Sequence, residues 1–189
     1  MNKRYSISLG FILLLVFLFC TISQADESGS SASKASSKPP QAEFVDTPYS
    51  GEQNVLFEIF LDEPGKIHSA LYWIRSYMNT MMGEPYALAP EFMNIIVLIH
   101  GTEIVTLAKK NYSKYKNAVQ RMRYYEQLGV EFRVCGDAAK DYGYTAKDFY
   151  SFVKIAPSAI TELAHWQNQG YAIIRPLVFE KKYSIEEIR

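Results

Sequence analysis

The sequence contains little cysteine, which excludes several kinds of functional site. Only Cys20 and Cys135 occur among 189 residues, and Cys20 lies in a segment that we expect to be removed. One remaining cysteine allows no internal disulfide and no Cys-x-x-Cys pair for thiol exchange. Together with the three histidines, it forms no spaced Cys/His set for zinc. We therefore expect no metal site, and a core that is stable without covalent links.

Glycine-rich motifs and an excess of one charge are also missing. No Gly-rich phosphate loop follows a strand, and Gly-x-Ser-x-Gly is absent, which argues against a nucleotide-binding turn and the usual α/β-hydrolase nucleophile. We expect no cofactor. Twenty basic residues balance twenty acidic ones, and loss of a leader with two basic residues leaves a net charge of −2. This balance does not favour nucleic acid or an anionic membrane surface as a partner.

The N-terminal 25 residues have the pattern of a signal peptide. Lys3 and Arg4 precede an apolar run over residues 7–22, and small residues at 23 and 25 suit cleavage after Ala25. We therefore predict a periplasmic or secreted protein. The alternative is that the apolar run stays as an anchor, since it approaches the length of a membrane span, and only then would the protein contact a membrane.

The composition of the remaining chain divides it into three further segments. Residues 26–50 are rich in Ser, Ala, Lys and Pro, and too poor in large apolar side chains to fold, so we predict a disordered tether. Residues 51–178 are predicted to form one α/β domain. Residues 179–189 form a C-terminal tail, which we expect to be a loose arm or an oligomer contact.

Strands alternate with helices throughout the predicted domain. Helix 67–81 shows apolar residues at steps of three and four, and the helical stretch 102–128 is expected to break near Asn111. Ser158 is predicted to cap the helix that follows it, with Ile160, Leu163, Ala164 and Gln167 facing inward. Predicted strands cover residues 54–61, 92–100, 130–135, 152–156 and 171–175. This alternation predicts a three-layer α/β/α fold with a mainly parallel five-stranded sheet.

Candidate site residues follow two apolar strands directly. His100 precedes Gly101, and Cys135 precedes Gly136 and Asp137 at the start of a predicted helix. Because ligands bind at the carboxyl ends of strands in such sheets, we expect both turns to face one crevice and contribute the catalytic pair Cys135 and His100. Gly101, Gly136 and Asp137 are the predicted binding residues.

The chemistry of this pair has a functional and a structural interpretation. A thiol at a helix start is favoured as a thiolate, and Gly136 allows a close approach to whatever the sulfur holds. A lone cysteine is also commonly a small buried hydrophobic residue, and position alone does not separate the two. His100 is expected to be an acid/base partner of the thiol or a ring that binds a loop carbonyl, the commoner case.

Four segments in order resemble the DsrE/DsrF-like family, over about residues 54–176. They are residues 97–101, 128–136, 155–163 and 169–176. The resemblance implies an α/β/α fold with a mainly parallel five-stranded sheet, and trimers or hexamers. It also implies a cysteine that carries sulfur as a persulfide between proteins, and Cys135 is similar to the cysteine of the family's exported branch.

Two functions are compatible with these features. The first is an exported protein that binds or relays sulfur as a persulfide on Cys135, exchanging it with a sulfur-donor or acceptor protein. The second is a non-catalytic module that binds a small ligand or assembles with other subunits, and whose cysteine is structural.

Overall fold

The computed structural model describes residues 41–45, 47–49 and 51–189. The predicted signal peptide and most of the predicted tether lie outside the described residues. The chain divides into two units, residues 1–43 and 44–189. The second unit contains the helices and strands described below, and the described residues before Gly51 are exposed and have no regular secondary structure.

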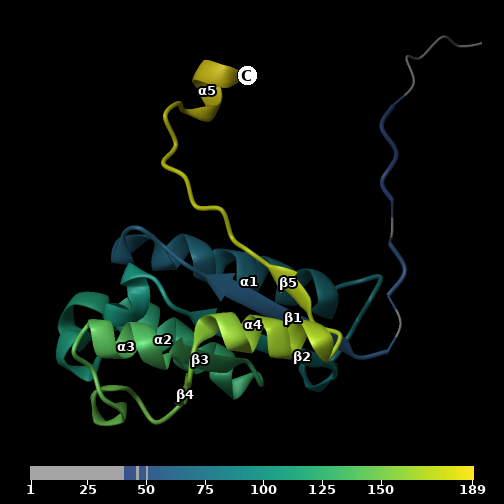
Figure 1. Ribbon diagram of the computed structural model, residues 1–189. Helices are drawn as coiled ribbons and strands as arrows, with labels where there is room; N and C mark the ends of the chain where they lie inside the picture. Colours follow the sequence, from purple (N-terminus) through teal and green to yellow (C-terminus); the bar gives the residue numbers. More distant parts are fainter. Residues whose placement is uncertain (1–40, 46, 50) are drawn as a thin grey trace, which may run out of the picture. The chain divides into compact units, whose positions relative to one another are not determined.

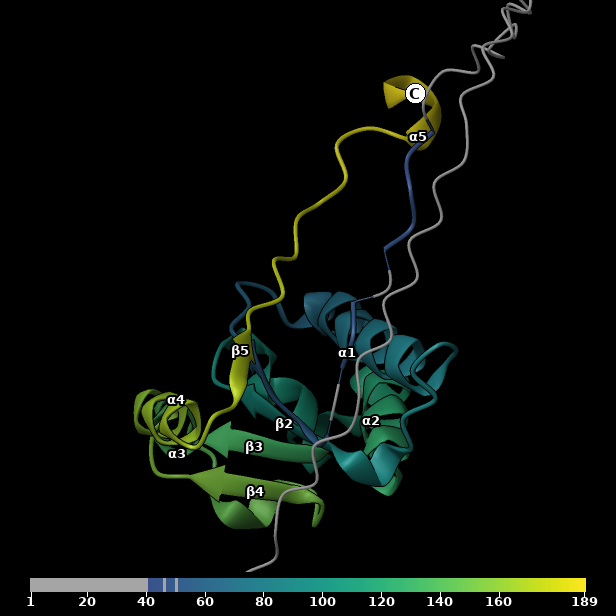
Figure 2. The same cartoon turned by 90° about the vertical axis from the view of Figure 1, so that its right-hand side faces the viewer.

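The centre of the second unit is a sheet of five parallel strands in the order β4-β3-β2-β1-β5. Figure 1 shows these strands with helices around them, and Figure 2 shows helices on both faces of the sheet. The predicted fold class is therefore confirmed. The strands are β1 (Gln53–Ile59), β2 (Met93–Ile99), β3 (Glu131–Cys135), β4 (Val153–Ala156) and β5 (Ala172–Ile174).

The first face of the sheet is covered by α1 (Ile67–Met82) and α2 (Tyr112–Gln127). The apolar stripe expected on the first of these helices is buried in the main core cluster. The expected break near Asn111 is confirmed, because Asn111 is the N-cap of α2 and Tyr115 departs from helical geometry. Short 3-10 turns complete this layer: η1 (Pro64–Lys66), η2 (Pro90–Phe92), η3 (Thr102–Leu107) and η4 (Lys109–Asn111).

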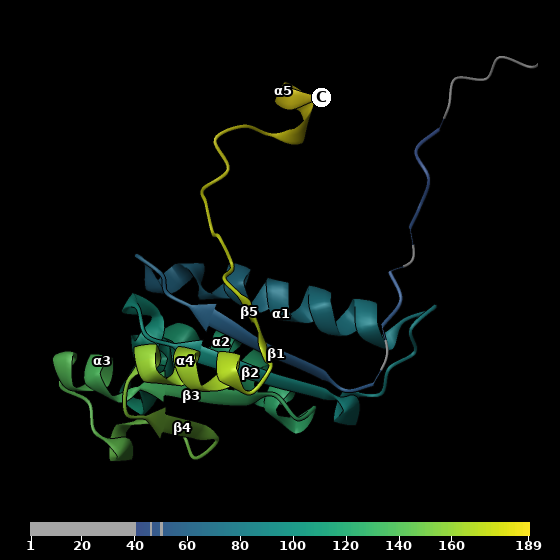
Figure 3. The same cartoon turned by 45° about the vertical axis from the view of Figure 1, so that its right-hand side comes forward.

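The second face carries α4 (Ala159–Asn168), while α3 (Gly136–Asp141) follows β3 directly (Figure 3). Its apolar cluster is smaller than the first. The turn η5 (Ala146–Asp148) begins with a capping box at Thr145, whose backbone N–H and hydroxyl both bond Asp148. The buried members of the second cluster are Leu56, Ile96, Leu98, Cys135 and Ala159.

The inward face predicted for α4 is right at Leu163 and wrong at its other three residues. Ile160, Ala164 and Gln167 are exposed, and Ile160 retains 71% of its accessible surface. The strand face beneath α4 is partly polar, so the residues that turn toward it include a carboxylate and an indole. Ser158 is the N-cap by position, but its side chain makes no capping hydrogen bond. The side chains that turn toward the sheet are Ala159, Glu162, Leu163 and Trp166.

The chain ends in a segment beyond β5 that closes with the short helix α5 (Ile185–Ile188). Pro176 is buried, whereas all nine residues from Lys181 to Arg189 are exposed. Figure 1 shows this segment leading away from β5. Within the part of the chain that the structure describes, no helix is both long and apolar enough to cross a membrane.

Candidate functional site

The carboxyl ends of β2 and β3 bring His100 and Cys135 to the same level of the sheet. Ile99 pairs with Val134 in the parallel register, so the residues that follow them occupy neighbouring positions. Adjacent strands lie about 4.8 Å apart, and alternation turns both side chains toward the face that carries α4. The expected juxtaposition of the two turns is therefore present in the backbone.

Cys135 is buried, with 6% of its surface exposed. Its Sγ atom accepts hydrogen bonds from the backbone nitrogen of Ala138 at 3.5 Å and of Ala159 at 3.2 Å. These two N–H groups belong to the first turns of α3 and α4. Two helix N-termini thus converge on one sulfur atom, and unpaired N–H groups there stabilise negative charge.

Gly136 allows this convergence because it has no side chain. A Cβ atom at this position would lie 2.8 Å from the carbonyl oxygen of Ala156 and 3.1 Å from that of Pro157. The turn after β3 therefore packs directly on the loop that leads from β4 into α4. Asp137 is exposed and pairs with Lys140 at 3.2 Å on the surface.

His100 has a carboxylate partner that the sequence did not reveal. Its Nε2 lies 3.1 Å from Oε1 of Glu58, whose second oxygen accepts a hydrogen bond from Nε of Arg175. The imidazole also stacks on Phe60, with 4.8 Å between ring centroids. The partner is therefore neither a loop carbonyl nor the Cys135 thiol. The only sequence signal for Glu58 was a charge inside an otherwise apolar strand.

Burial lowers the pKa of His100 below its ordinary value of 6.5, and the positive charge of Arg175 acts in the same direction. The negative charge of Glu58 and its hydrogen bond oppose this shift in part. At neutral pH the imidazole is therefore uncharged. With Nε2 donating to Glu58, the other ring nitrogen, Nδ1, is left as a proton acceptor.

Glu103 holds the loop after His100 in place. Its side chain is fully buried, and its oxygens accept hydrogen bonds from the backbone nitrogens of Leu61 and Gly101, each at 2.9 Å. Burial raises the pKa of Glu103, although these hydrogen bonds oppose the shift. A Cβ atom on Gly101 would lie 2.5 Å from both Glu103 Oε2 and Leu61 N, so glycine is required there for close packing.

A cavity of about 900 Å³ opens beside His100 and Gly101. Its walls come from the β1 and β2 turns, Tyr142 and the segment after β5. The charged side chains around it are mixed, with Asp62, Glu63 and Glu180 against Lys66 and Lys182. Cys135 and Gly136 do not line this cavity. Of the two turns that were expected to face one crevice, only the turn at His100 and Gly101 lines it. Among the described residues, no group of His, Cys, Asp and Glu is placed to hold a metal ion.

The sequence also matches a known protein family over the strands and turns described above. The model of the DsrE/DsrF-like family matches residues 55–176. The chain belongs to the DsrE/DsrF-like family. The match falls inside the predicted domain 51–178 and includes His100 and Cys135.

A solved structure shares this fold, and a second solved structure is similar to the chain at a lower level. One is a protein of unknown function, MTH1491 from Methanobacterium thermoautotrophicum, with 20% identity and a TM-score of 0.53 over 66% of this chain and 100% of that chain. Another is the conserved protein of unknown function BT1422 from Bacteroides thetaiotaomicron, with 14% identity and a TM-score of 0.44 over 65% of this chain and 93% of that one. No curated protein matches the sequence.

Proposed function

We propose that this protein is an exported member of the DsrE/DsrF-like family that binds or relays sulfur as a persulfide on Cys135. Family membership supports a role in sulfur relay. The observation that carries the proposal is the pair of backbone N–H groups at Sγ, from Ala138 and Ala159. These donors stabilise a thiolate before sulfur transfer.

The transfer requires no external oxidant. The Cys135 thiolate attacks the outer, sulfane sulfur of a donor persulfide, R–S–SH. A new S–S bond forms at Sγ, the S–S bond of the donor breaks, and its electron pair leaves with R–S⁻. The proton stays on the transferred sulfur, so Cys135 becomes a persulfide and the donor becomes a thiolate.

His100 is proposed as the proton acceptor for the Cys135 thiol. The imidazole is uncharged at neutral pH, and its Nδ1 is free to take a proton because Nε2 binds Glu58. Its place directly after β2, beside the end of β3, keeps His100 and Cys135 on one face of the sheet. Gly101, Gly136 and Asp137 remain the predicted binding residues.

The N-terminal sequence and the family resemblance support the setting that we propose for this reaction. Cleavage after Ala25 would place the protein in the periplasm or outside the cell, with a sulfur-donor or acceptor protein as partner. From the family resemblance, we also propose that copies of this protein assemble into trimers or hexamers. Recovery of the protein from cell fractions, followed by sequencing of its N-terminus, tests export. An N-terminus at Met1 in the cytoplasmic fraction contradicts it.

Burial of Cys135 favours a second candidate function. The thiol keeps only 6% of its surface and packs beside Leu56, Leu98 and Ala159, as a structural cysteine does. The protein would then be a module that binds a small ligand or assembles with other subunits. A test of whether Cys135 takes up sulfur distinguishes the two candidate functions.

The decisive experiment measures the mass of the purified mature protein after incubation with polysulfide. The expected result is an addition of one sulfur atom at Cys135, which a reducing thiol removes. Cys135→Ser is the matched control and should gain no sulfur. A Cys135 thiol that stays unmodified, while glutathione in the same solution reacts, excludes the sulfur carrier and leaves the structural cysteine.

A further inference from the structure

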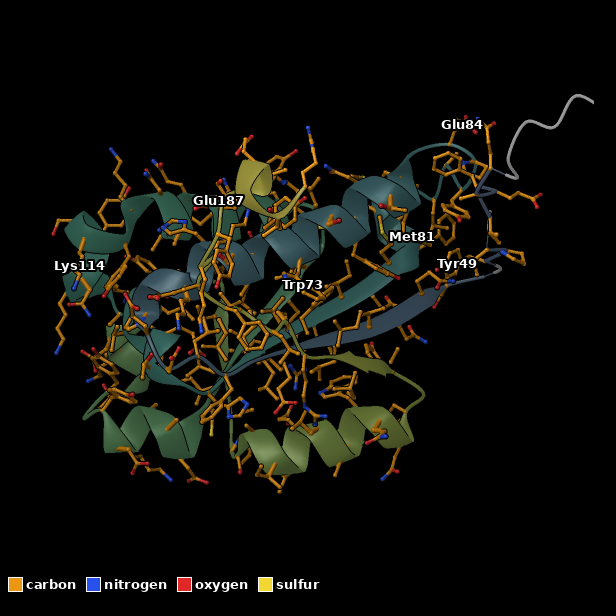
Figure 4. All side chains as sticks on the ribbon, turned by 90° about the horizontal axis from the view of Figure 1, so that it is seen from above. Tyr49, Trp73, Met81, Glu84, Lys114 and Glu187 are labelled. Carbon is orange, nitrogen blue, oxygen red and sulfur yellow. The ribbon has the colours of Figure 1, made fainter. Side chains whose placement is uncertain are left out.

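The C-terminal arm, defined as residues 177–189, supplies one wall of the cavity beside His100. Leu177 and Phe179 line the cavity, and Val178 packs against the main core. The arm ends in α5, which carries Glu187 (Figure 4). It lies beyond residues 55–176, which match the family. This wall of the cavity is therefore outside the part of the chain that the family model covers.

Three large apolar side chains line the cavity and keep most of their surface in water. Phe60, Leu177 and Phe179 are 70%, 66% and 78% exposed. Phe60 stacks on the imidazole of His100 with one side of its ring, so the other side is open. Exposed apolar groups gathered around a cavity are typical of a ligand-binding site. We therefore expect the body of a ligand to be apolar, and flat where it meets Phe60.

The imidazole of His100 gives the cavity a hydrogen-bond acceptor. Its Nε2 binds Glu58, and its Nδ1 makes no hydrogen bond with any residue that the structure describes. This Nδ1 atom is not fully buried, and the ring lines the cavity. Because an uncharged imidazole that donates through Nε2 accepts at Nδ1, a ligand that bonds there must present an O–H or N–H donor.

A buried carboxylate fixes the part of the cavity next to this acceptor. Glu103 accepts hydrogen bonds from the backbone nitrogens of Leu61 and Gly101, and both of these residues line the cavity. The hydroxyl of Thr102 adds a hydrogen bond to the carbonyl oxygen of Leu61 at 3.0 Å. The turns after β1 and β2 are therefore held together before a ligand arrives, which reduces the free-energy cost of binding.

The charged side chains around the cavity do not select an ion. Lys66 pairs with Asp62 at 2.8 Å, and Glu63, Glu180 and Lys182 are exposed to water, which screens their charges. Three acidic side chains oppose two basic ones, so an anion gains no attraction from the set. These observations favour an uncharged ligand.

We propose that this cavity binds a neutral aromatic molecule that carries one O–H or N–H donor, as phenols and indoles do. The ring lies against the open side of Phe60, the donor bonds Nδ1 of His100, and Leu177 and Phe179 of the arm cover the outer side. This inference rests on the second candidate function, small-ligand binding, and names its ligand class. It does not require sulfur chemistry at Cys135, which does not line the cavity.

Binding of small probes to the full chain tests the ligand class. Phenol and indole carry the donor, toluene lacks it, and benzoate and benzylammonium add a charge. NMR shifts of the His100 imidazole and the Phe179 amide at neutral pH give the Kd of each probe. We expect phenol or indole to bind about three- to tenfold tighter than toluene, the net effect of one hydrogen bond, and the tighter of the two shows whether the donor is O–H or N–H. Toluene binding as tightly as both, or a charged probe binding more tightly than both, overturns the proposal.

A substitution at His100 tests the acceptor. His100→Phe keeps a ring beside Phe60 and removes Nδ1, so phenol should bind no tighter than toluene, while toluene still binds. A preference for phenol that persists in this variant contradicts the role of Nδ1. If the variant does not fold, the comparison of phenol with toluene in the wild-type protein decides.

Substitutions in the arm test its place as a wall. Leu177→Ser with Phe179→Ser should weaken the binding of phenol and of toluene by at least about fivefold, since both rings lose apolar contact. Ile185→Ser with Ile188→Ser, at the tip of the same arm and outside the cavity, is the matched control and should change neither affinity. All four positions are exposed, so these variants retain the fold. An unchanged affinity in the first variant, or an equal loss in the control, refutes the arm wall.

The mass measurement on Cys135 separates failure of this inference from failure of sulfur relay. Gain of sulfur at Cys135 without binding of phenol or indole rejects the cavity ligand and leaves sulfur relay in place. Binding of phenol or indole without gain of sulfur supports the cavity ligand and rejects sulfur relay.

Discussion

The Sγ atom of Cys135 lies 3.2 Å from the backbone nitrogen of Ala159, the first residue of α4. This contact joins the end of β3 to the start of a helix 24 residues later in the chain. It has two consequences. The N–H group donates a hydrogen bond to the sulfur, and the N-terminal turn of α4 covers the thiol. The sulfur uptake proposed for Cys135 would therefore require the start of α4 to move away from β3.

The covered thiol should react slowly with a disulfide reagent. We expect Cys135 to react at least about tenfold more slowly than a cysteine placed at exposed Ser113, because the fold must open first. The measurement is the rate of thiol labelling in a Cys20→Ser background at increasing urea. A rate independent of urea indicates local opening at α4, and one that rises with urea indicates unfolding of the whole domain. Equal rates for the two cysteines contradict the burial of Cys135.

A side chain at Gly101 should destabilise the fold. In Gly101→Ala the new Cβ would lie 2.5 Å from the Leu61 nitrogen and 2.8 Å from its carbonyl oxygen, neither of which belongs to a flexible side chain. We expect the free energy of unfolding to fall by about 1–3 kcal/mol, as measured by urea unfolding. Gly65→Ala is the control, since its Cβ would approach only the Glu63 carboxylate, at 3.3 Å. That variant should stay within about 0.5 kcal/mol of wild type.

The sheet and the first helical layer were predictable because their signals are local. Met93–Ile99 is almost continuously apolar, as a strand buried on both faces must be, and α1 shows a regular apolar stripe. The inward face of α4 was mispredicted at three of its four residues, because the sequence of the helix does not show which strand face lies beneath it. The strand face beneath α4 carries Arg133, which donates to Glu162, so the helix buries polar groups in place of Ile160.

The positions of the site residues were predictable, but their partners were not. His100 and Cys135 follow from the rule that strand ends collect at one edge. Glu58 lies on β1, 42 residues before His100, and Arg175 directly follows β5, 75 residues after His100, and sequence spacing does not bring them together. The backbone nitrogen of Ala159 has no sequence signature at all.

Opposite shifts are expected when the two charges near His100 are removed in turn. Glu58→Gln removes the interactions that raise the pKa of His100, so this pKa should fall further below 6.5. Arg175→Gln removes a positive charge that lowers it, so this pKa should rise toward 6.5. Titration of the imidazole by NMR measures both. Shifts of the same sign in the two variants would show that the ion pair in the structure does not control His100.

The lowered pKa of His100 also determines how the free energy of unfolding should change with pH. Below pH 6.5 the unfolded chain takes up a proton that the folded imidazole resists. Stability from this group is therefore present above pH 6.5 and lost as the pH falls through the folded-state pKa. His100→Gln should flatten this part of the profile of unfolding free energy against pH. An unchanged slope between wild type and His100→Gln contradicts the assignment.

Glu103 should contribute a pH dependence of the opposite sign. Burial raises its pKa above the ordinary 4.5, so the folded state binds a proton more tightly than the unfolded state does. Its contribution is greatest below pH 4.5 and is lost as the pH rises through the folded-state pKa. Comparison with Glu103→Gln in urea unfolding isolates this term, since glutamine keeps the shape and does not titrate. We expect the stability of wild type relative to Glu103→Gln to fall as the pH rises, and the reverse slope rules out a raised pKa.

The corrected inward face of α4 predicts which of its residues stabilise the domain. Trp166 lies 4.7 Å from the Arg133 guanidinium, donates to Glu162 at 2.9 Å and packs edge-on against Tyr171. Trp166→Ala should lower the free energy of unfolding by about 2–3 kcal/mol, less than for a fully buried tryptophan. Ile160→Ser on the same helix should change it by less than about 0.5 kcal/mol, because that side chain is 71% exposed. Urea unfolding of the two variants side by side decides the orientation of α4, and a larger effect at Ile160 would restore the face that amphipathic periodicity first indicated.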